Sequence, residues 1–162
     1  MEKISTFLWF DNQAEEAVNF YTSLFKDSKK GQMSRYSEAS SGPAGSVMTA
    51  TFELEGRKFV ALNGGPHFKF TEAISFVINC DNQQEVDYYW DGLLNGGGTP
   101  SQCGWLKDKY GLSWQVIPTI LSKLLADKDR ERAKRVMQAM LNMVKIDIKT
   151  LEDAYNAEPI EQ

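Results

Sequence analysis

The sequence predicts an α+β protein made of two tandem βαβββ modules followed by a helical C-terminal tail. Three observations support this fold class: an internal repeat at an offset of 70 residues, an amphipathic helix pattern inside each copy, and purely helical periodicity beyond Pro118. We place the modules at about residues 1–66 and 70–118, together one domain of residues 1–118. The helical extension then covers residues 119–162.

The repeat is strongest at the start of each module. Between positions 4 and 15, six of twelve residues are identical to those 70 positions later, including an Asp-Asn-Gln turn. Residues 4–10 and 73–80, which precede this turn, are rich in aromatic and β-branched side chains and predict strands. The Asp or Asn of the turn is expected to accept a hydrogen bond from the first turn of a helix. One structural unit therefore occurs twice.

Helical spacing of apolar residues follows both turns and predicts helices over residues 14–25 and 83–94. The apolar positions are Ala14, Ala17, Val18, Tyr21 and Phe25 in the first helix and Val86, Tyr89, Trp90 and Leu93 in the second. Three shorter extended segments, separated by glycine turns, follow each helix: residues 32–38, 46–55 and 58–63, then 99–102, 103–107 and 113–118. Residues 37–45, which are small and polar without periodicity, predict a loop.

The tail carries one long apolar stripe with a period of 3.6 residues: Ala133, Val136, Met137, Met140, Leu141 and Val144. A helix with such a stripe needs a surface to pack against, because most of its stability comes from that packing. We expect a homodimer whose interface this tail helps to cover. The alternative is that the tail folds back onto its own sheet in a monomer.

Composition excludes several classes of partner. The chain has 18 basic and 22 acidic residues, a net charge of −4, and no basic stripe, so we expect no nucleic-acid surface. No apolar segment is long enough to span a bilayer, and the N-terminus lacks a signal pattern. The two cysteines form no disulfide framework. We therefore expect a cytoplasmic protein with no membrane partner.

Three segments point to a known family: residues 7–21, which begin Phe-Leu-Trp-Phe-Asp, the Leu-Asn-Gly-Gly-Pro loop at residues 62–66, and residues 102–115. With the two βαβββ units, they resemble the PhnB-like branch of the vicinal oxygen chelate (glyoxalase/bleomycin resistance/dioxygenase) superfamily, often labelled 3-demethylubiquinone-9 3-methyltransferase. The resemblance covers nearly the whole chain and implies that fold. It does not name a reaction, because the superfamily spans lyases, isomerases, dioxygenases, thiol transferases and drug-sequestering proteins.

Superfamily enzymes usually hold a divalent metal through His and Glu side chains on the first and last strands of each module. Here Gln115 occupies the position where the resemblance implies a Glu ligand, and an amide is a weak ligand for a catalytic metal. Neither strand face that we assign to the cleft carries His or Glu. These faces are Ile4, Thr6, Leu8 and Phe10 on the first strand and Ala73, Ser75, Val77 and Asn79 on the fifth. We therefore expect no metal and no cofactor.

Eight residues are candidates for a ligand-binding cleft: Thr6, Leu8, Asn63, His67, Ser75, Cys103, Trp105 and Gln115. Asn63 and Gln115 are the polar candidates, because an amide both donates and accepts. Trp105, on the strand face assigned to Cys103, is either a pocket wall for a flat ligand or plain core. Cys103 lines the cleft or acts as a nucleophile.

His67, the single histidine, is either a proton shuttle at the cleft mouth or an exposed loop residue packed against aromatics. The residues favour a metal-free protein that binds a small molecule, with the reaction and catalytic residues unknown. The alternative is an enzyme: a metal-dependent lyase, isomerase or dioxygenase, or the methyltransferase of the family label. The glycine turns weaken the last option, since none opens a helix after a strand as a nucleotide-binding turn does.

Overall fold

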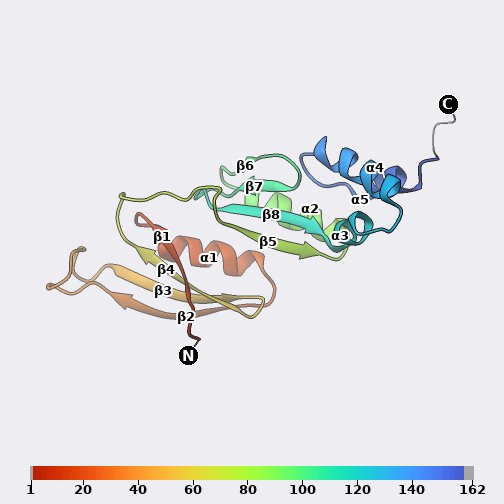
Figure 1. Cartoon of the computed structure of the whole chain (residues 1–162). Coiled ribbons are helices and arrows are strands. Elements are labelled where there is room, and N and C mark those ends of the chain that lie inside the picture. Colours follow the sequence, from red (N-terminus) through yellow and green to blue (C-terminus); the bar gives the residue numbers. More distant parts are fainter. Residues whose placement is uncertain (1, 159–162) are drawn as a thin grey trace. The chain divides into compact units, whose positions relative to one another are not determined.

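The computed structural model describes residues 2–158, which divide into two compact units, one ending at Phe70 and the other beginning at Thr71 (Figure 1). The first unit holds one sheet whose strands run in the order β1-β4-β3-β2, with β1 parallel to β4 and the other pairs antiparallel. Its elements are β1 (Thr6–Phe10), α1 (Ala14–Leu24), β2 (Ser28–Arg35), β3 (Val47–Leu54) and β4 (Arg57–Asn63).

The second unit repeats this arrangement, with strand order β5-β8-β7-β6 and β5 parallel to β8. Its module contains β5 (Ser75–Cys80), α2 (Gln83–Leu94), β6 (Thr99–Pro100), β7 (Trp105–Lys107) and β8 (Ser113–Pro118). Strand, helix and three strands therefore occur twice, which confirms the predicted fold class.

Most element bounds agree with the sequence pattern, and the second strand is the main exception. It begins at Ser28, four residues before the expected start at Gln32, and ends at Arg35. Its sequence, SKKGQMSR, lacks the apolar alternation of a buried strand because β2 lies at the edge of the sheet and is mostly exposed. Residues 37–45 contain neither helix nor strand, as predicted.

Helix α1 packs on β3 and β4 and buries one face of the first sheet. Three aromatic rings stack there: Tyr21 lies 6.0 Å from Phe52, which lies 5.2 Å from Phe59, measured between ring centroids. Leu8 is buried on this same face, because its register partner on β4 is Ala61, two residues after Phe59. The helix-covered face is thus a closed apolar core.

The expected orientation of the first strand is therefore wrong. Thr6, Leu8 and Phe10 alternate toward the helix, and Phe7 (59% exposed) and Trp9 lie on the open face. The fifth strand has the orientation that we expected. Its buried residues Ile78 and Cys80 lie under α2, which leaves Ser75, Val77 and Asn79 on the open face. The alternation of β5 was decisive because its open face is more polar than its buried face.

The tail forms three helices, α3 (Thr119–Leu125), α4 (Arg130–Leu141) and α5 (Ile148–Asn156), within the second unit (teal to blue in Figure 1). They enclose a small core of their own: Leu121, Val136, Met143, Ile146 and Leu151. The predicted stripe is divided between two environments. Val136 is part of this core and Ala133 is also buried, but Met137, Leu141 and Val144 are 39%, 58% and 43% exposed.

Backbone hydrogen bonds fix the tail to the second module. The amides of Cys103 and Gly104 donate to the carbonyls of Met143 and Val144, both at 2.8 Å. Gly104 has φ +84°, and an added Cβ would lie 2.9 Å from the carbonyl oxygen of Val116, so the chain requires glycine here. The tail is therefore anchored on its own module.

A second clamp comes from Gln83, at the start of α2. Its side-chain oxygen accepts from the amide of Ile148 at 2.8 Å, and its side-chain nitrogen donates to the carbonyl of Ile146 at 3.0 Å. One side chain thus satisfies backbone groups on both sides of Asp147, the N-cap of α5.

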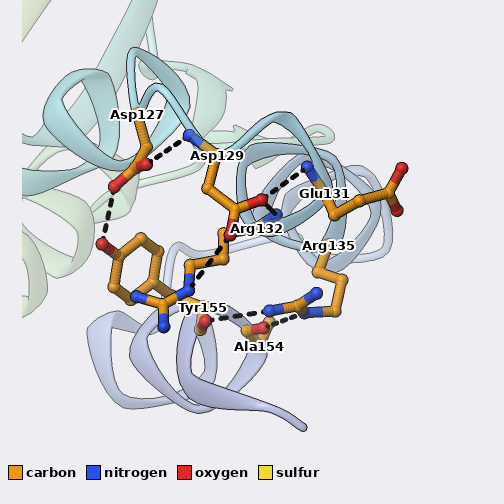
Figure 2. A network of polar contacts seen from close by, with 7 residues as sticks. All are labelled: Asp127, Asp129, Glu131, Arg132, Arg135, Ala154 and Tyr155. Carbon is orange, nitrogen blue, oxygen red and sulfur yellow. Dashed lines mark hydrogen bonds and ion pairs between the residues drawn. The ribbon is translucent and has the colours of Figure 1, made fainter. Parts of the chain in front are cut away.

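Polar contacts also hold the tail helices together, as Figure 2 shows. Arg135 on α4 donates to the carbonyl oxygens of Ala154 and Tyr155 at the end of α5, at 2.9 and 3.2 Å. The Tyr155 hydroxyl donates to Asp127 at 2.6 Å and holds the pKa of that carboxyl below its usual value. Figure 2 also shows Asp129 capping α4 through the amides of Glu131 and Arg132.

Candidate ligand-binding face of the second module

Two neighbouring rows of side chains on the face of the second sheet opposite α2 carry most of its polar groups. Strand register places Val77, Gln115 and Trp105 in one row, and Ser75, Ser113 and Lys107 in the next. Alternation turns Trp114 to the other face, where it is 4% exposed. The face therefore combines an amide, two hydroxyls, a lysine and an indole ring on rigid strands.

Gln115 and Ser75 form the polar centre of this face. The Gln115 amide nitrogen donates to the Ser75 hydroxyl oxygen at 3.0 Å. The side-chain carbonyl oxygen of Gln115 and the hydroxyl hydrogen of Ser75 have no hydrogen-bond partner among residues 2–158. The pair is thus oriented by its own hydrogen bond and still offers one acceptor and one donor to a ligand.

Ser113 occupies the centre of the neighbouring row and is 1% exposed. Its hydroxyl is the one buried side-chain oxygen or nitrogen in the described part of the chain without a hydrogen-bond partner. Beside it, Lys107 forms an ion pair with Glu72, whose side chain is 61% exposed. The hydrogen bond from Lys107 holds the pKa of Glu72 below its ordinary value.

Asp108 fixes the turn that joins β7 to β8. This carboxylate is 3% exposed, and its Oδ1 accepts from the amides of Tyr110 at 2.9 Å and Leu112 at 3.1 Å. Its Oδ2 accepts from the indole N–H of Trp114 at 2.9 Å. One buried carboxylate therefore sets the positions of Lys107 before the turn and Ser113 after it.

The first module also has an open face, which forms a groove of about 440 Å³ with the N-terminal segment. Lys29, Thr51, Lys58 and Val60 are among its lining residues. This groove differs chemically from the open face of the second sheet. Lysines such as Lys29 and Lys58 line it, and its lining residues include no amide–hydroxyl pair like Gln115 and Ser75. Of the residues expected to line a cleft from the first strand, neither Thr6 nor Leu8 lies here.

Asn63, an expected ligand contact, supports the fold of the first module. Its Oδ1 accepts from the amide of Ala14 at 2.8 Å and its Nδ2 donates to the carbonyl of Val47 at 3.0 Å. The predicted cap of α1 is therefore replaced, since the N-cap Gln13 makes no side-chain hydrogen bond. In α2 the predicted cap is present: Asn82 accepts from the amide of Glu85 at 2.9 Å. Both side-chain groups of Asn63 are thus used within the fold, and the residue also lines the cavity that contains His67.

His67 is exposed and lines a different cavity, of about 640 Å³, at one end of the first sheet. The loop 37–46 and the start of α1 form the other walls, with Arg35, Asp11 and Glu15 among the lining residues. The aromatic contacts of this loop involve its neighbours, since Phe68 packs edge-on against Trp9 and Phe70 against Phe10. His67 belongs to the first unit and Gln115 to the second.

Cys103 does not lie on a strand, which corrects the expectation that it shares a strand face with Trp105. It occupies the turn before β7 with φ 57°, and its amide anchors the tail. Cys80 is buried in the core. Burial raises the pKa of the Cys80 thiol to about 12, with smaller contributions from Glu85 and Asp81.

The described residues do not fit the metal site of superfamily enzymes. Within residues 2–158 no three His, Cys, Asp or Glu side chains lie close enough together to hold a metal ion. The neighbours of Gln115 on the open face are Val77 and Trp105, which supply no ligand atoms of the kind that catalytic zinc or iron requires.

Sequence reasoning identified Ser75, Trp105 and Gln115 correctly as residues of one sheet face, but it did not select Ser113 or Lys107. The signal was present, because Lys107 lies two residues after Trp105 and Ser113 two residues before Gln115. In a strand, residues two apart share a face. Ser113 stands out only through its unsatisfied hydroxyl, which no sequence pattern reveals.

Two βαβββ units, each with one helix-covered and one open sheet face, place this chain in the vicinal oxygen chelate class of proteins. The chain belongs to the 3-demethylubiquinone-9 3-methyltransferase family, whose model matches residues 2–117. It matches none of the curated proteins. In the described residues no helix is long and apolar enough to cross a membrane.

Solved structures agree with this assignment. A PhnB protein of Bacillus cereus, which carries a provisional 3-demethylubiquinone-9 3-methyltransferase label, is 39% identical with a TM-score of 0.66, and the alignment covers 73% of this chain and 100% of that one. A Pseudomonas aeruginosa protein is 19% identical with a TM-score of 0.59, covering 73% and 98%. A fosfomycin resistance protein of Listeria monocytogenes is 11% identical with a TM-score of 0.53, covering 76% and 97%. The last two are similar in fold alone.

Proposed function

We propose that this protein binds a small organic molecule on the open face of β5, β8 and β7, without using a metal ion. The observation that carries the proposal is the Gln115–Ser75 pair, whose unused acceptor and donor lie on a rigid sheet beside the Trp105 ring. Sites for small molecules commonly combine apolar or aromatic walls with a few placed polar groups. This face has that composition.

Each residue has a distinct role in the proposed site. Trp105 supplies a flat apolar surface, on which a ring or planar group of the ligand can pack. Gln115 and Ser75 orient the ligand through its polar edge, since together they offer one acceptor and one donor. A neutral amide at position 115 is suited to hydrogen bonding and poorly suited to polarising a substrate through a metal.

A thermal-shift screen of small metabolites, with and without EDTA, tests this function. A ligand that binds only the folded state raises the unfolding temperature, by an amount set by its concentration relative to its dissociation constant. We expect hits that persist in EDTA, are lost in Gln115→Ala and are weakened in Trp105→Ala. Gln84→Ala, a change on the exposed surface of α2, is the matched control. Asn63→Asp is unsuitable as a control, because it alters the hydrogen bond that caps α1.

Two outcomes contradict the proposal. Hits that appear only after addition of a divalent metal would favour a metal-dependent lyase, isomerase or dioxygenase. Hits confined to S-adenosylmethionine and its products would favour the methyltransferase named by the family. The glycine turns give the second outcome little support: Gly64-Gly65 leads to β5 and Gly96-Gly97-Gly98 leads to β6, so neither turn opens a helix.

We also propose that the protein is a cytoplasmic homodimer. The exposed apolar residues Met137, Leu141 and Val144 of the tail, together with the exposed edge strand β2, support self-association. Both cysteines are free thiols, which suits a reducing compartment. Light scattering at micromolar concentration tests the assembly: a mass of twice 18.3 kDa is expected, and a mass near 18.3 kDa contradicts the dimer.

A further inference from the structure

The buried hydroxyl of Ser113 requires an explanation, because it has no partner among the described residues. A buried polar group without a hydrogen bond destabilises the fold, and an alanine at this position would avoid that loss. Unsatisfied groups of this kind therefore indicate a binding role when they lie beside a ligand site. Ser113 lies on β8 between Ser75 and Lys107, directly next to the row of Gln115.

Lys107, the lysine in this row, is paired with a carboxylate that a ligand anion can replace. Lys107 pairs with Glu72, which precedes β5 and lies outside the sheet, and the two side chains are 41% and 61% exposed. Exposed ion pairs contribute little to stability, since solvent screens them. Separating Lys107 from Glu72 thus costs little free energy. It would leave the Lys107 ammonium group beside the unused hydroxyl donor of Ser113.

We propose that Lys107 and Ser113 form a subsite for an anionic oxygen group of the ligand, which takes the place of Glu72. This inference rests on the proposed function and names the ligand class: an organic acid. Lys107 supplies the charge, Ser113 donates its unused hydroxyl hydrogen, and Ser75 can donate from the other side. Hydrogen bonds with a charged partner are stronger than neutral ones, so this subsite would dominate selectivity.

The spacing on β7 adds a restriction on ligand shape. Trp105 and Lys107 are two residues apart on one strand, a separation of roughly 7 Å between their Cα atoms. A planar ring on Trp105 with a carboxylate directly attached spans such a distance. Aromatic monocarboxylic acids therefore fit the face, and benzoate with its neutral analogue benzamide provides a pair of probes of almost the same shape.

Isothermal titration calorimetry of the full chain with benzoate and benzamide tests the subsite. We expect benzoate to bind at least tenfold more tightly, because only benzoate carries the charge that Lys107 recognises. Lys107→Met should abolish the preference for benzoate over benzamide. Lys123→Met, an equal change of charge at an exposed residue of α3, should keep it. Glu72→Gln should strengthen benzoate binding by about threefold to tenfold by removing the competing carboxylate.

Ser113→Ala separates a binding role from a structural one. We expect this variant to bind benzoate about fivefold to tenfold more weakly, while its unfolding temperature without ligand stays equal to that of the parent or rises. A purely structural serine would show a lower unfolding temperature and unchanged benzoate affinity, and that result overturns the proposal.

The outcomes distinguish failure of this inference from failure of the proposed function. If benzamide binds as tightly as benzoate and Lys107→Met changes neither affinity, the anionic subsite is refuted and the ligand-binding face stands. If neither probe binds and no metabolite in the thermal-shift screen raises the unfolding temperature, both are refuted.

Discussion

Removal of the Asp108 carboxylate tests how the β7–β8 turn is held. Three N–H donors, the amides of Tyr110 and Leu112 and the indole of Trp114, point at this buried group within 2.9–3.1 Å. A hydrogen bond to a charged group contributes about 1.5–3 kcal/mol, and a buried donor left without a partner costs about 1–3 kcal/mol. With partial rescue by water, Asp108→Ala should lower the free energy of unfolding by about 4 kcal/mol.

Asp108→Asn refines this prediction because it keeps the size of the side chain. Its carbonyl oxygen can serve the two backbone amides, but its NH₂ group faces the indole N–H of Trp114, so one bond is lost and two are weakened. We expect a loss of about 2–3 kcal/mol. Urea denaturation followed by tryptophan fluorescence measures both variants, with the exposed Asp11→Asn as a control expected to change stability by under about 0.5 kcal/mol. A cost below about 1 kcal/mol for Asp108→Ala would refute the reasoning.

Four further predictions concern other residues. Gln83→Ala should speed amide hydrogen exchange throughout α5, while its exposed neighbour Gln84→Ala should not, since only Gln83 binds the tail backbone. Cys103 should react with iodoacetamide in the folded protein and Cys80 only after unfolding, as mass spectrometry of labelled peptides would show; equal rates would contradict the burial of Cys80. Because the pKa of Cys80 is about 12 when folded against an ordinary value of 9.0, the unfolded chain loses this proton first. Stability should therefore fall between about pH 9 and pH 12, by at most about 1.4 kcal/mol per pH unit, and Cys80→Ala should remove that part of the fall in alkaline urea titrations. Asn63→Ala should cost about 2–3 kcal/mol in urea denaturation, because it removes the cap of α1 and leaves the carbonyl of Val47 without its donor; a change under 1 kcal/mol would show that the brace is dispensable.

The fold was predictable because local and repeated signals agreed. The 70-residue repeat fixed two equal units, and the apolar spacing of α2 gave its bounds, Gln83–Leu94, without error. The β5 strand could be oriented because Phe76, Ile78 and Cys80 alternate with the more polar Ser75 and Asn79. Such a strand has one face that is clearly better buried.

The errors arose where the pattern was symmetric or the partner was distant. In β1 both faces are apolar, since Leu8 and Phe10 alternate with Phe7 and Trp9, so alternation cannot select the buried side. The contacts of Asn63 with α1 span 49 residues and leave no local trace in the sequence.

The tail posed the same difficulty on a larger scale. Its apolar stripe required a partner surface, and periodicity does not say which one. The structure supplies it through pairs far apart in sequence, such as Gln83 with Ile148 and Cys103 with Met143. Three residues of the stripe, Met137, Leu141 and Val144, stay exposed.

The most direct test of the central claim, a ligand site on the open face of the second sheet, is a two-dimensional ¹H–¹⁵N NMR titration with benzoate and benzamide. Trp105 and Trp114 lie on opposite faces of that sheet, so their indole N–H signals provide an internal comparison. The account predicts that at least one probe shifts the Trp105 indole and the Gln115 side-chain amide signals and leaves the Trp114 indole nearly unchanged. Shifts confined to other surfaces, or no shift of Trp105 and Gln115 with either probe at millimolar concentration, would contradict it.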